Sequence, residues 1–254
     1  MFVACSTLCF GRLSLEDALA AIAELQFTKY EASLHEQGRQ LRPSEVAADI
    51  GHAASRLRHG PGLMPVAFSV EIEADDPVEY DRQFKAVCRL ARVSAVPLLT
   101  IRAAATDTDF DREIERLRHL VRLGTTDGIQ VAVSTRLGTL TEDPDVALSL
   151  CQRVDGLALT LDPSHFLVGP NPEKCYDSLY PFVKHVHLRD TRRGANQFQV
   201  RIGQGEIEYG RILTHLARHR YDRVLCVDIH DIPDAPFAMQ PEVRKLKYLL
   251  ESLV

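Results

Sequence analysis

The feature of this sequence that most constrains its fold is a regular alternation of short apolar runs with helical patterns along the whole chain. The apolar runs are rich in β-branched residues and are therefore predicted to be strands. They cover Phe2 to Cys5, Phe27 to Leu34, Pro65 to Ile72, Val96 to Arg102, Ile129 to Ser134, Leu157 to Asp162, Lys184 to Arg189 and Arg223 to Ile229. Eight strands with helices between them predict a parallel sheet, and eight is the number that closes a barrel.

Helical patterns occupy the segments between these runs. Helices are expected at Leu15 to Leu25, Pro43 to Leu57, Pro77 to Val93, Asp109 to Leu123, Pro172 to Leu179, Tyr209 to Arg218 and Pro241 to Leu253. A length of 254 residues is near that of one α/β barrel, so residues 1–254 are expected to form one domain. We therefore predict an α/β fold of the single-domain (β/α)8, or TIM barrel, type.

The alternative fold is an open, doubly wound parallel sheet. The segment after the first strand, Cys5-Ser-Thr-Leu-Cys-Phe-Gly11, lacks the glycine-rich phosphate loop typical of that fold. The nearest match, Gly203-Gln-Gly205, follows a long polar loop and not a strand. The sequence therefore favours the barrel.

Composition excludes several classes of protein. A net charge of −5 argues against a nucleic-acid partner, because phosphates are collected by a basic face. The six cysteines form no C-x-x-C pair, which argues against a zinc ribbon and favours a reducing, cytoplasmic setting. The start of the chain resembles a strand more than a signal peptide, and no apolar run approaches the roughly 20 residues that cross a bilayer. No membrane partner is expected, and a homo-oligomer stays open.

Side-chain parity places three polar residues at one end of the predicted barrel. In the segments 157–162, 184–189 and 224–228, most leucines and valines share the parity that suits the helix layer. The opposite parity points Asp162, His187 and Asp228 into the barrel interior. Because all three come near the carboxyl ends of consecutive strands, they are expected to meet where barrel enzymes place their catalytic groups.

Two carboxylates and an imidazole suit a divalent cation, with water and substrate oxygens in the open positions. His165, three residues after Asp162, is placed to reach a substrate hydroxyl. Each residue also has a purely structural interpretation. A strand histidine is commonly a hydrogen-bonded core residue, and Asp162 before Pro163 can simply start a turn. The convergence of the three favours a site.

Three motifs carry a family resemblance. Leu161-Asp-Pro-Ser-His165, His185-Val-His-Leu-Arg-Asp190 and Ile202-Gly-Gln-Gly-Glu-Ile207 resemble the sugar phosphate isomerase/epimerase superfamily of xylose-isomerase-like TIM barrels. That group includes ketose 3-epimerases, hydroxypyruvate isomerases, inosose dehydratases and endonuclease IV-type enzymes. The resemblance covers essentially the whole chain and implies the barrel fold, but it singles out no one reaction.

The resemblance implies a metal site and also a departure from it. Ketose epimerases of this kind hold one divalent ion with a Glu, an Asp, a His and a Glu on strands five to eight. Asp162 and His187 match the middle pair, whereas Ser134 falls at the first position and Asp228, one methylene shorter, at the last. The expected cofactor is Mn²⁺, Mg²⁺, Co²⁺ or Zn²⁺ held by Asp162, His187 and Asp228, bound weakly or absent altogether.

The resemblance and the parity together nominate substrate contacts. His165 and Arg193 match a histidine and an arginine that contact substrate in the family. Inward parity places Glu31, Glu71 and Arg102 near the mouth, where each serves equally well as a salt-bridged rim residue. The expected ligand is a small carbohydrate-like molecule.

The missing strand-five carboxylate bears on mechanism. In the epimerases the two metal-binding glutamates also pass protons on opposite faces of the substrate. Ser134 cannot do this, so we expect a one-base reaction, such as an aldose–ketose isomerization or a dehydration, with Asp228 as base and His165 assisting. An endonuclease is excluded, because its extra zinc ligands fall at Gln197-Phe198-Gln199.

Two functions therefore remain. The first is a metal-dependent isomerase, epimerase or related lyase acting on a small sugar or sugar-like carbonyl compound. The alternative is a catalytically impaired barrel that binds a sugar-like metabolite without turnover.

Overall fold

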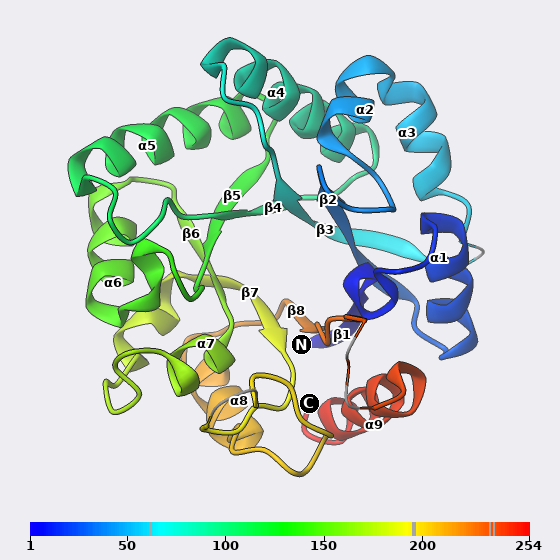
Figure 1. Ribbon diagram of the computed structural model, residues 1–254, viewed down its shortest axis with the longest axis vertical. Helices are drawn as coiled ribbons and strands as arrows, with labels where there is room; N and C mark the ends of the chain where they lie inside the picture. Colours follow the sequence, from blue (N-terminus) through cyan, green and yellow to red (C-terminus); the bar gives the residue numbers. More distant parts are fainter. Residues whose placement is uncertain (61, 195–196, 234, 236) are drawn as a thin grey trace.

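Eight parallel strands close into a barrel in the computed structural model, which describes residues 1–254 except 61, 195–196, 234 and 236 (Figure 1). The strands are β1 (Phe2–Ser6), β2 (Lys29–His35), β3 (Met64–Glu71), β4 (Leu98–Arg102), β5 (Gln130–Ser134), β6 (Ala158–Leu161), β7 (Val183–Leu188) and β8 (Val224–Val227). Each strand pairs with the next in sequence, and β1 closes the ring on β8 with Phe2 opposite Val224. The predicted single-domain (β/α)8 barrel is confirmed.

Helices surround the strands on the outside of the barrel (Figure 1). They are α1 (Leu15–Glu24), α2 (Pro43–Ala48), α3 (Ile50–Leu57), α4 (Pro77–Val93), α5 (Phe110–Thr126), α6 (Pro144–Arg153), α7 (Pro163–Val168), α8 (Tyr209–Arg218) and α9 (Met239–Glu251). Short 3-10 helices at Thr7–Phe10, Leu140–Glu142 and Asp177–Phe182 lie in the connections.

Two of the predicted helices differ from the structure. The helix expected over 43–57 divides at Asp49, whose extended backbone starts α3 while its side chain accepts a hydrogen bond from the N–H of His52. The helix expected over 172–179 is replaced by the 3-10 helix Asp177–Phe182, which contains Pro181. Its place after β6 is taken by α7, which lies outside the predicted ranges.

The barrel interior changes from apolar to polar toward the carboxyl ends of the strands. Ala67, Leu98, Ala132 and Ala158 form one buried apolar cluster. Two residues further along β4 and β6, the hydroxyls of Thr100 and Thr160 are 2.8 Å apart. Because inward side chains recur every second residue, the next inward positions are the ones that form the mouth of the barrel.

A repeated Asp-Pro pair starts three of the helices. Asp76, Asp143 and Asp162 each precede the proline that begins α4, α6 and α7. Each aspartate accepts a hydrogen bond from the backbone N–H two residues later, and proline suits the first helical position because it has no N–H to satisfy. The third pair fixes the position of a candidate site residue.

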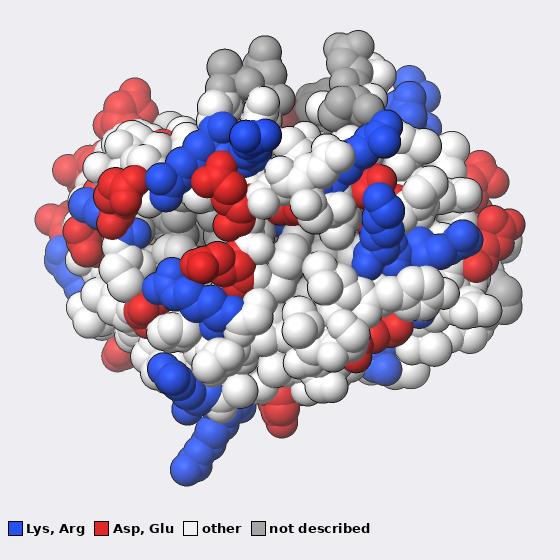
Figure 2. Space-filling view, turned by 90° about the horizontal axis from the view of Figure 1, so that it is seen from below, with Lys and Arg blue, Asp and Glu red and all other residues white. Residues whose placement is uncertain are grey.

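The outer surface mixes the two signs of charge. On the face that Figure 2 shows, Lys and Arg side chains lie among Asp and Glu side chains. Among the described residues, no helix is both long and apolar enough to cross a membrane.

Gly124 in α5 gives a test of how closely this helix packs on the barrel. A Cβ atom there would lie 2.7 Å from Cγ2 of Val131 and 2.8 Å from the carbonyl oxygen of Ile129. Glycine to alanine normally stabilises a helix by about 0.5–1 kcal/mol, but overpacking costs about 1–3 kcal/mol. We expect Gly124→Ala to lower the free energy of unfolding, as measured by urea denaturation.

Gly210→Ala in α8 is the matched control, because a Cβ atom there meets no atom within 4 Å. It should stabilise the protein. Equal effects of the two substitutions would show that α5 does not press on β5.

Candidate active site

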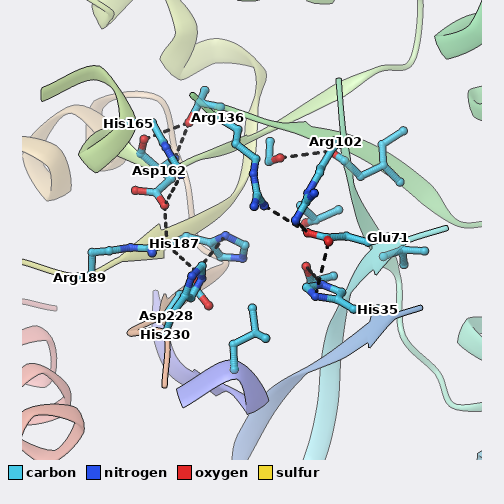
Figure 3. Close-up of a pocket in the computed structure, with 17 residues that line it drawn as sticks. His35, Glu71, Arg102, Arg136, Asp162, His165, His187, Arg189, Asp228 and His230 are labelled. Carbon is cyan, nitrogen blue, oxygen red and sulfur yellow. Dashed lines mark hydrogen bonds and ion pairs between the residues drawn. The ribbon is translucent and has the colours of Figure 1, made fainter. Parts of the chain in front are cut away.

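A polar cavity of about 140 Å³ opens at the carboxyl ends of the strands (Figure 3). Its walls include Asp162, His187 and Asp228, which lie in or directly after β6, β7 and β8, together with His165 of α7. A cavity of this size suits a small metabolite, since drug-sized ligands occupy pockets of about 300–1,000 Å³.

Asp162, His187 and Asp228 meet in this cavity, as their parity predicts. Each offers a ligand atom, and these atoms all lie within 4.8 Å of one another. The three side chains are buried. The two carboxylate oxygens of Asp162 have different partners. Oδ1 accepts a hydrogen bond from the N–H of Ser164 at the start of α7, and Oδ2 faces the cavity, where it accepts from Arg189. The turn and the site interpretations of Asp162 are therefore compatible.

Arg189, on the same side of β7 as His187, pairs with both aspartates. Its Nη2 atom lies 2.7 Å from Oδ2 of Asp162 and 2.7 Å from Oδ2 of Asp228. The side chain is 1% exposed, and its guanidinium lies 4.9 Å from the centre of the Phe198 ring. Burial alone would raise the pKa of both carboxyls, but nearby positive charge, including that of Arg189, lowers both. Both aspartates are therefore ionised at neutral pH.

Glu31 lies below this group and binds two imidazoles. Its carboxylate is 2.5 Å from Nε2 of His185 and 2.9 Å from Nε2 of His187. Burial favours uncharged forms here, yet the attraction between these groups lowers the pKa of Glu31 to about 2 and raises that of His187 to about 9. Glu31 points inward as expected and is buried, but it is not among the residues that line the cavity. Its hydrogen bond to Nε2 holds the imidazole of His187.

His165 lies beside Asp162, with Nε2 3.4 Å from Oδ2 of that residue. Its Nδ1 accepts a hydrogen bond from the N–H of Leu137, so the ring proton is on Nε2. The ring packs against Phe198 with centroids 4.7 Å apart. Burial lowers the pKa of His165 to about 4. The imidazole is therefore neutral at neutral pH and can donate a hydrogen bond into the cavity.

Arg193, expected to contact substrate, lies elsewhere. Its side chain is 48% exposed, pairs with Glu173 at 3.0 Å, and is absent from the cavity walls. The loop that carries it is anchored by Asp190, which accepts hydrogen bonds from the N–H groups of Gly203 and Gly205. These amides are thereby satisfied within the protein.

The strand-five and strand-four ends complete the cavity. Ser134 faces it and donates a hydrogen bond to the carbonyl of Ile101 at 3.2 Å. Arg102 lines it as expected and forms an ion pair with Glu71. Arg136, which the sequence analysis did not single out, lines it too and pairs with the same carboxylate. Side-chain parity could have predicted the position of Arg136, because it lies two residues after the inward-facing Ser134.

The residues present fit a divalent cation. Two ionised carboxylates and an imidazole converge, and Oδ1 of Asp228 is buried with no hydrogen-bond partner among the described residues. Nδ1 of His187 faces Asp228 at 3.6 Å, while Nε2 is held by Glu31, the arrangement common for metal-binding histidines. Arg189 already pairs with both aspartates, so a metal ion bound by these residues must displace its guanidinium. The ion must also displace the Nδ1 proton of His187, which a pKa of about 9 retains at neutral pH.

The guanidinium of Arg189 is held in an unfavourable geometry between the two aspartates, so a metal ion could replace it. One nitrogen of Arg189 serves both carboxylates, whereas its Nε and Nη1 atoms are buried without a partner in the described part of the chain. A bidentate pair, with two parallel hydrogen bonds to one carboxylate, would be stronger.

Comparison with known proteins agrees with this fold. Residues 19–249 match the family described as xylose isomerase-like TIM barrel, and the chain belongs to that family. An uncharacterized protein, MJ1311 of Methanocaldococcus jannaschii, is 26% identical over 49% of this chain. The match spans 45% of that protein, less than half of its length.

Solved structures superpose over nearly the whole chain. A probable 3-DHS dehydratase, AsbF, from Bacillus anthracis has a TM-score of 0.76 at 16% identity, with 99% of each chain covered. A xylose isomerase-like protein from Mycobacterium smegmatis in complex with magnesium also scores 0.76, at 18% identity, covering 99% of this chain and 97% of its own. D-allulose 3-epimerase from Methylomonas sp. scores 0.75 at 12% identity, covering 100% and 98%. At these identities the likeness shows the fold.

Removing Arg189 should strengthen metal binding. Arg189→Met leaves two buried carboxylates without their cation, which destabilises a protein by about 3–5 kcal/mol. We expect this variant to bind Mn²⁺ at least about tenfold more tightly than the wild type by titration calorimetry, and its melting temperature to rise more when Mn²⁺ is added.

Arg189→Lys retains the positive charge and is the matched control. It should show neither gain. If Arg189→Met folds and binds Mn²⁺ no better than Arg189→Lys, the arginine and the metal ion do not compete for the aspartates.

A carboxylate at the strand-five position should also strengthen metal binding. Ser134 faces the cavity, so Ser134→Glu adds an anionic ligand, and anionic oxygens are the main attraction for a hard cation. We expect tighter Mn²⁺ or Co²⁺ binding in calorimetry, with Ser134→Gln as the uncharged control. No gain in a folded Ser134→Glu variant would mean that the site does not hold a metal in this geometry.

Proposed function

We propose that this protein is an isomerase or epimerase, or a related lyase, acting on a small polyhydroxylated carbonyl compound. The observation that carries the proposal is the convergence of Asp162, His187 and Asp228 in a small polar cavity at the carboxyl ends of the strands. Membership of the xylose isomerase-like family supports it, as do structural relatives described as a dehydratase and an epimerase.

In this proposal Asp162, Asp228 and Nδ1 of His187 hold a divalent ion, which is Mn²⁺, Mg²⁺, Co²⁺ or Zn²⁺. The relative in complex with magnesium supports a metal of this kind. When bound, such an ion polarises a carbonyl or hydroxyl oxygen of the substrate. Glu31 keeps the imidazole of His187 in the orientation that this role requires.

Asp228 is the proposed base, and His165 assists it. Asp228 is ionised because His230, at 3.1 Å, together with His187 and Arg189, lowers its pKa. The same ion pairs weaken it as a base, because a general base works best with a pKa near the working pH. Movement of Arg189 away from Asp228 would raise its basicity. His165, neutral with its proton on Nε2, donates a hydrogen bond to a substrate oxygen.

A second candidate function is binding of a sugar-like metabolite without turnover. The observation that favours it is the ion pairing of Arg189 with both aspartates, together with Ser134 at the strand-five position. In that case the positive charge needed between the carboxylates is supplied permanently by the protein.

Exchange of carbon-bound protons separates the two functions. The wild-type protein is incubated in D₂O with Mn²⁺ and a pool of small polyhydroxylated carbonyl compounds, and deuterium uptake is followed by mass spectrometry. We expect uptake into at least one compound. Asp228→Asn should reduce the rate by about 10²–10⁴, the usual contribution of a general base, whereas Ser134→Ala should cost little.

Near-full exchange in Asp228→Asn would place the base elsewhere. Absence of exchange for every compound with the wild-type protein would favour the binding function.

A further inference from the structure

Two arginines stand on the cavity wall opposite the aspartates. Arg102 ends β4 and Arg136 follows β5, and Figure 3 shows both guanidinium groups directed toward Glu71, away from Asp162 and Asp228. Their side chains are 42% and 34% exposed, in contrast to the buried Arg189. A ligand in the cavity can therefore reach both.

The positive charge on this wall is only partly balanced. Arg102 and Arg136 share a single carboxylate oxygen, Oε1 of Glu71, from which Nη1 of Arg136 lies 3.2 Å away. His35 lies 3.8 Å from the other oxygen, but burial lowers its pKa to about 4, so at neutral pH it is uncharged. Glu73 also attracts Arg102, but it is exposed and screened by water. Two guanidinium groups thus face one partly buried carboxylate.

The two arginines also have hydrogen-bonding capacity to spare. A guanidinium offers five N–H donors. Each arginine directs one terminal nitrogen at Glu71, and in the described part of the chain their other nitrogens have no side-chain or backbone acceptor. Guanidinium groups with free edges bind carboxylates and phosphates through paired hydrogen bonds.

We propose that Arg102 and Arg136 form an anion subsite, and that the ligand of this cavity is a polyhydroxylated compound with a terminal carboxylate or phosphate. The inference rests on the proposed function and specifies its substrate class. The anionic end lies against Arg102 and Arg136, and the hydroxyl and carbonyl end faces Asp162 and Asp228. The opposite charges of the two walls fix this orientation.

Three six-carbon ligands test the proposal, and they differ in whether a terminal carbon carries an anionic group. D-Glucitol is uncharged, D-gluconate carries a carboxylate, and D-glucitol 6-phosphate carries a phosphate. In titration calorimetry with chelator-treated buffer, at least one acidic ligand should bind the wild-type protein about tenfold or more tighter than D-glucitol, since hydrogen bonds to charged groups carry this much discrimination. The acidic ligand that binds more tightly shows whether the subsite prefers a carboxylate or a phosphate.

Substitutions assign the effect to the two arginines. Arg136→Gln and Arg102→Gln should each remove most of the preference for the acidic ligand over D-glucitol. Glu71→Gln should increase the preference, because it frees both guanidinium groups. Arg92→Gln is the matched control: Arg92 pairs with Asp127 at 3.1 Å, outside the cavity, and its loss should change nothing.

The outcomes separate this inference from the proposed function. Equal affinities for the three ligands, unchanged in Arg136→Gln, would overturn the anion subsite and leave the proposed function standing. An acidic preference that survives both arginine substitutions in folded variants would also overturn it. Failure of all three ligands to bind at tens of millimolar would count against both.

Discussion

Compensation of buried negative charge is the constraint on which the rest of this site depends. Glu31, Asp162 and Asp228 are each at most 2% exposed, and all three are held in the ionised form. A carboxylate in such a place costs several kcal/mol unless it is paired and hydrogen-bonded. Arg189 and His187 supply the opposing charge. Any cation that enters the site changes this balance of charge, and substitution of any one of these charged residues affects the others.

The balance is organised by one strand. His185 and His187 are inward residues of β7, and Arg189 directly follows this strand. Their partners come from β2, from the end of β6 and from the end of β8. Strand β7 therefore ties together segments that are far apart in the sequence. This position also explains why His187 contacts two carboxylates at once, with Glu31 on one ring nitrogen and Asp228 near the other. The strand is part of the barrel wall and also supplies side chains that pair with the buried carboxylates.

The cavity has two electrostatically different sides. One side carries Asp162 and Asp228, and the other carries Arg102, Arg136 and Glu71 (Figure 3). A neutral imidazole, His165, stands on the acidic side as a hydrogen-bond donor. A ligand that is polar at one end and anionic at the other would match this arrangement better than a uniformly neutral one.

The sequence by itself determined the barrel and the inward direction of Asp162, His187 and Asp228, because the alternation of apolar and polar residues along a strand is a local property. It also showed that Ser134 stands at the strand-five position. It could not determine that Arg189 lies between the two aspartates, since that contact joins three strand ends and depends on the stagger of the barrel. Nor could it remove Arg193 from the site, because the path of its loop is set by Asp190 and the backbone of Gly203 and Gly205. Local pattern fixes which face a residue takes, and tertiary structure decides which charges meet there.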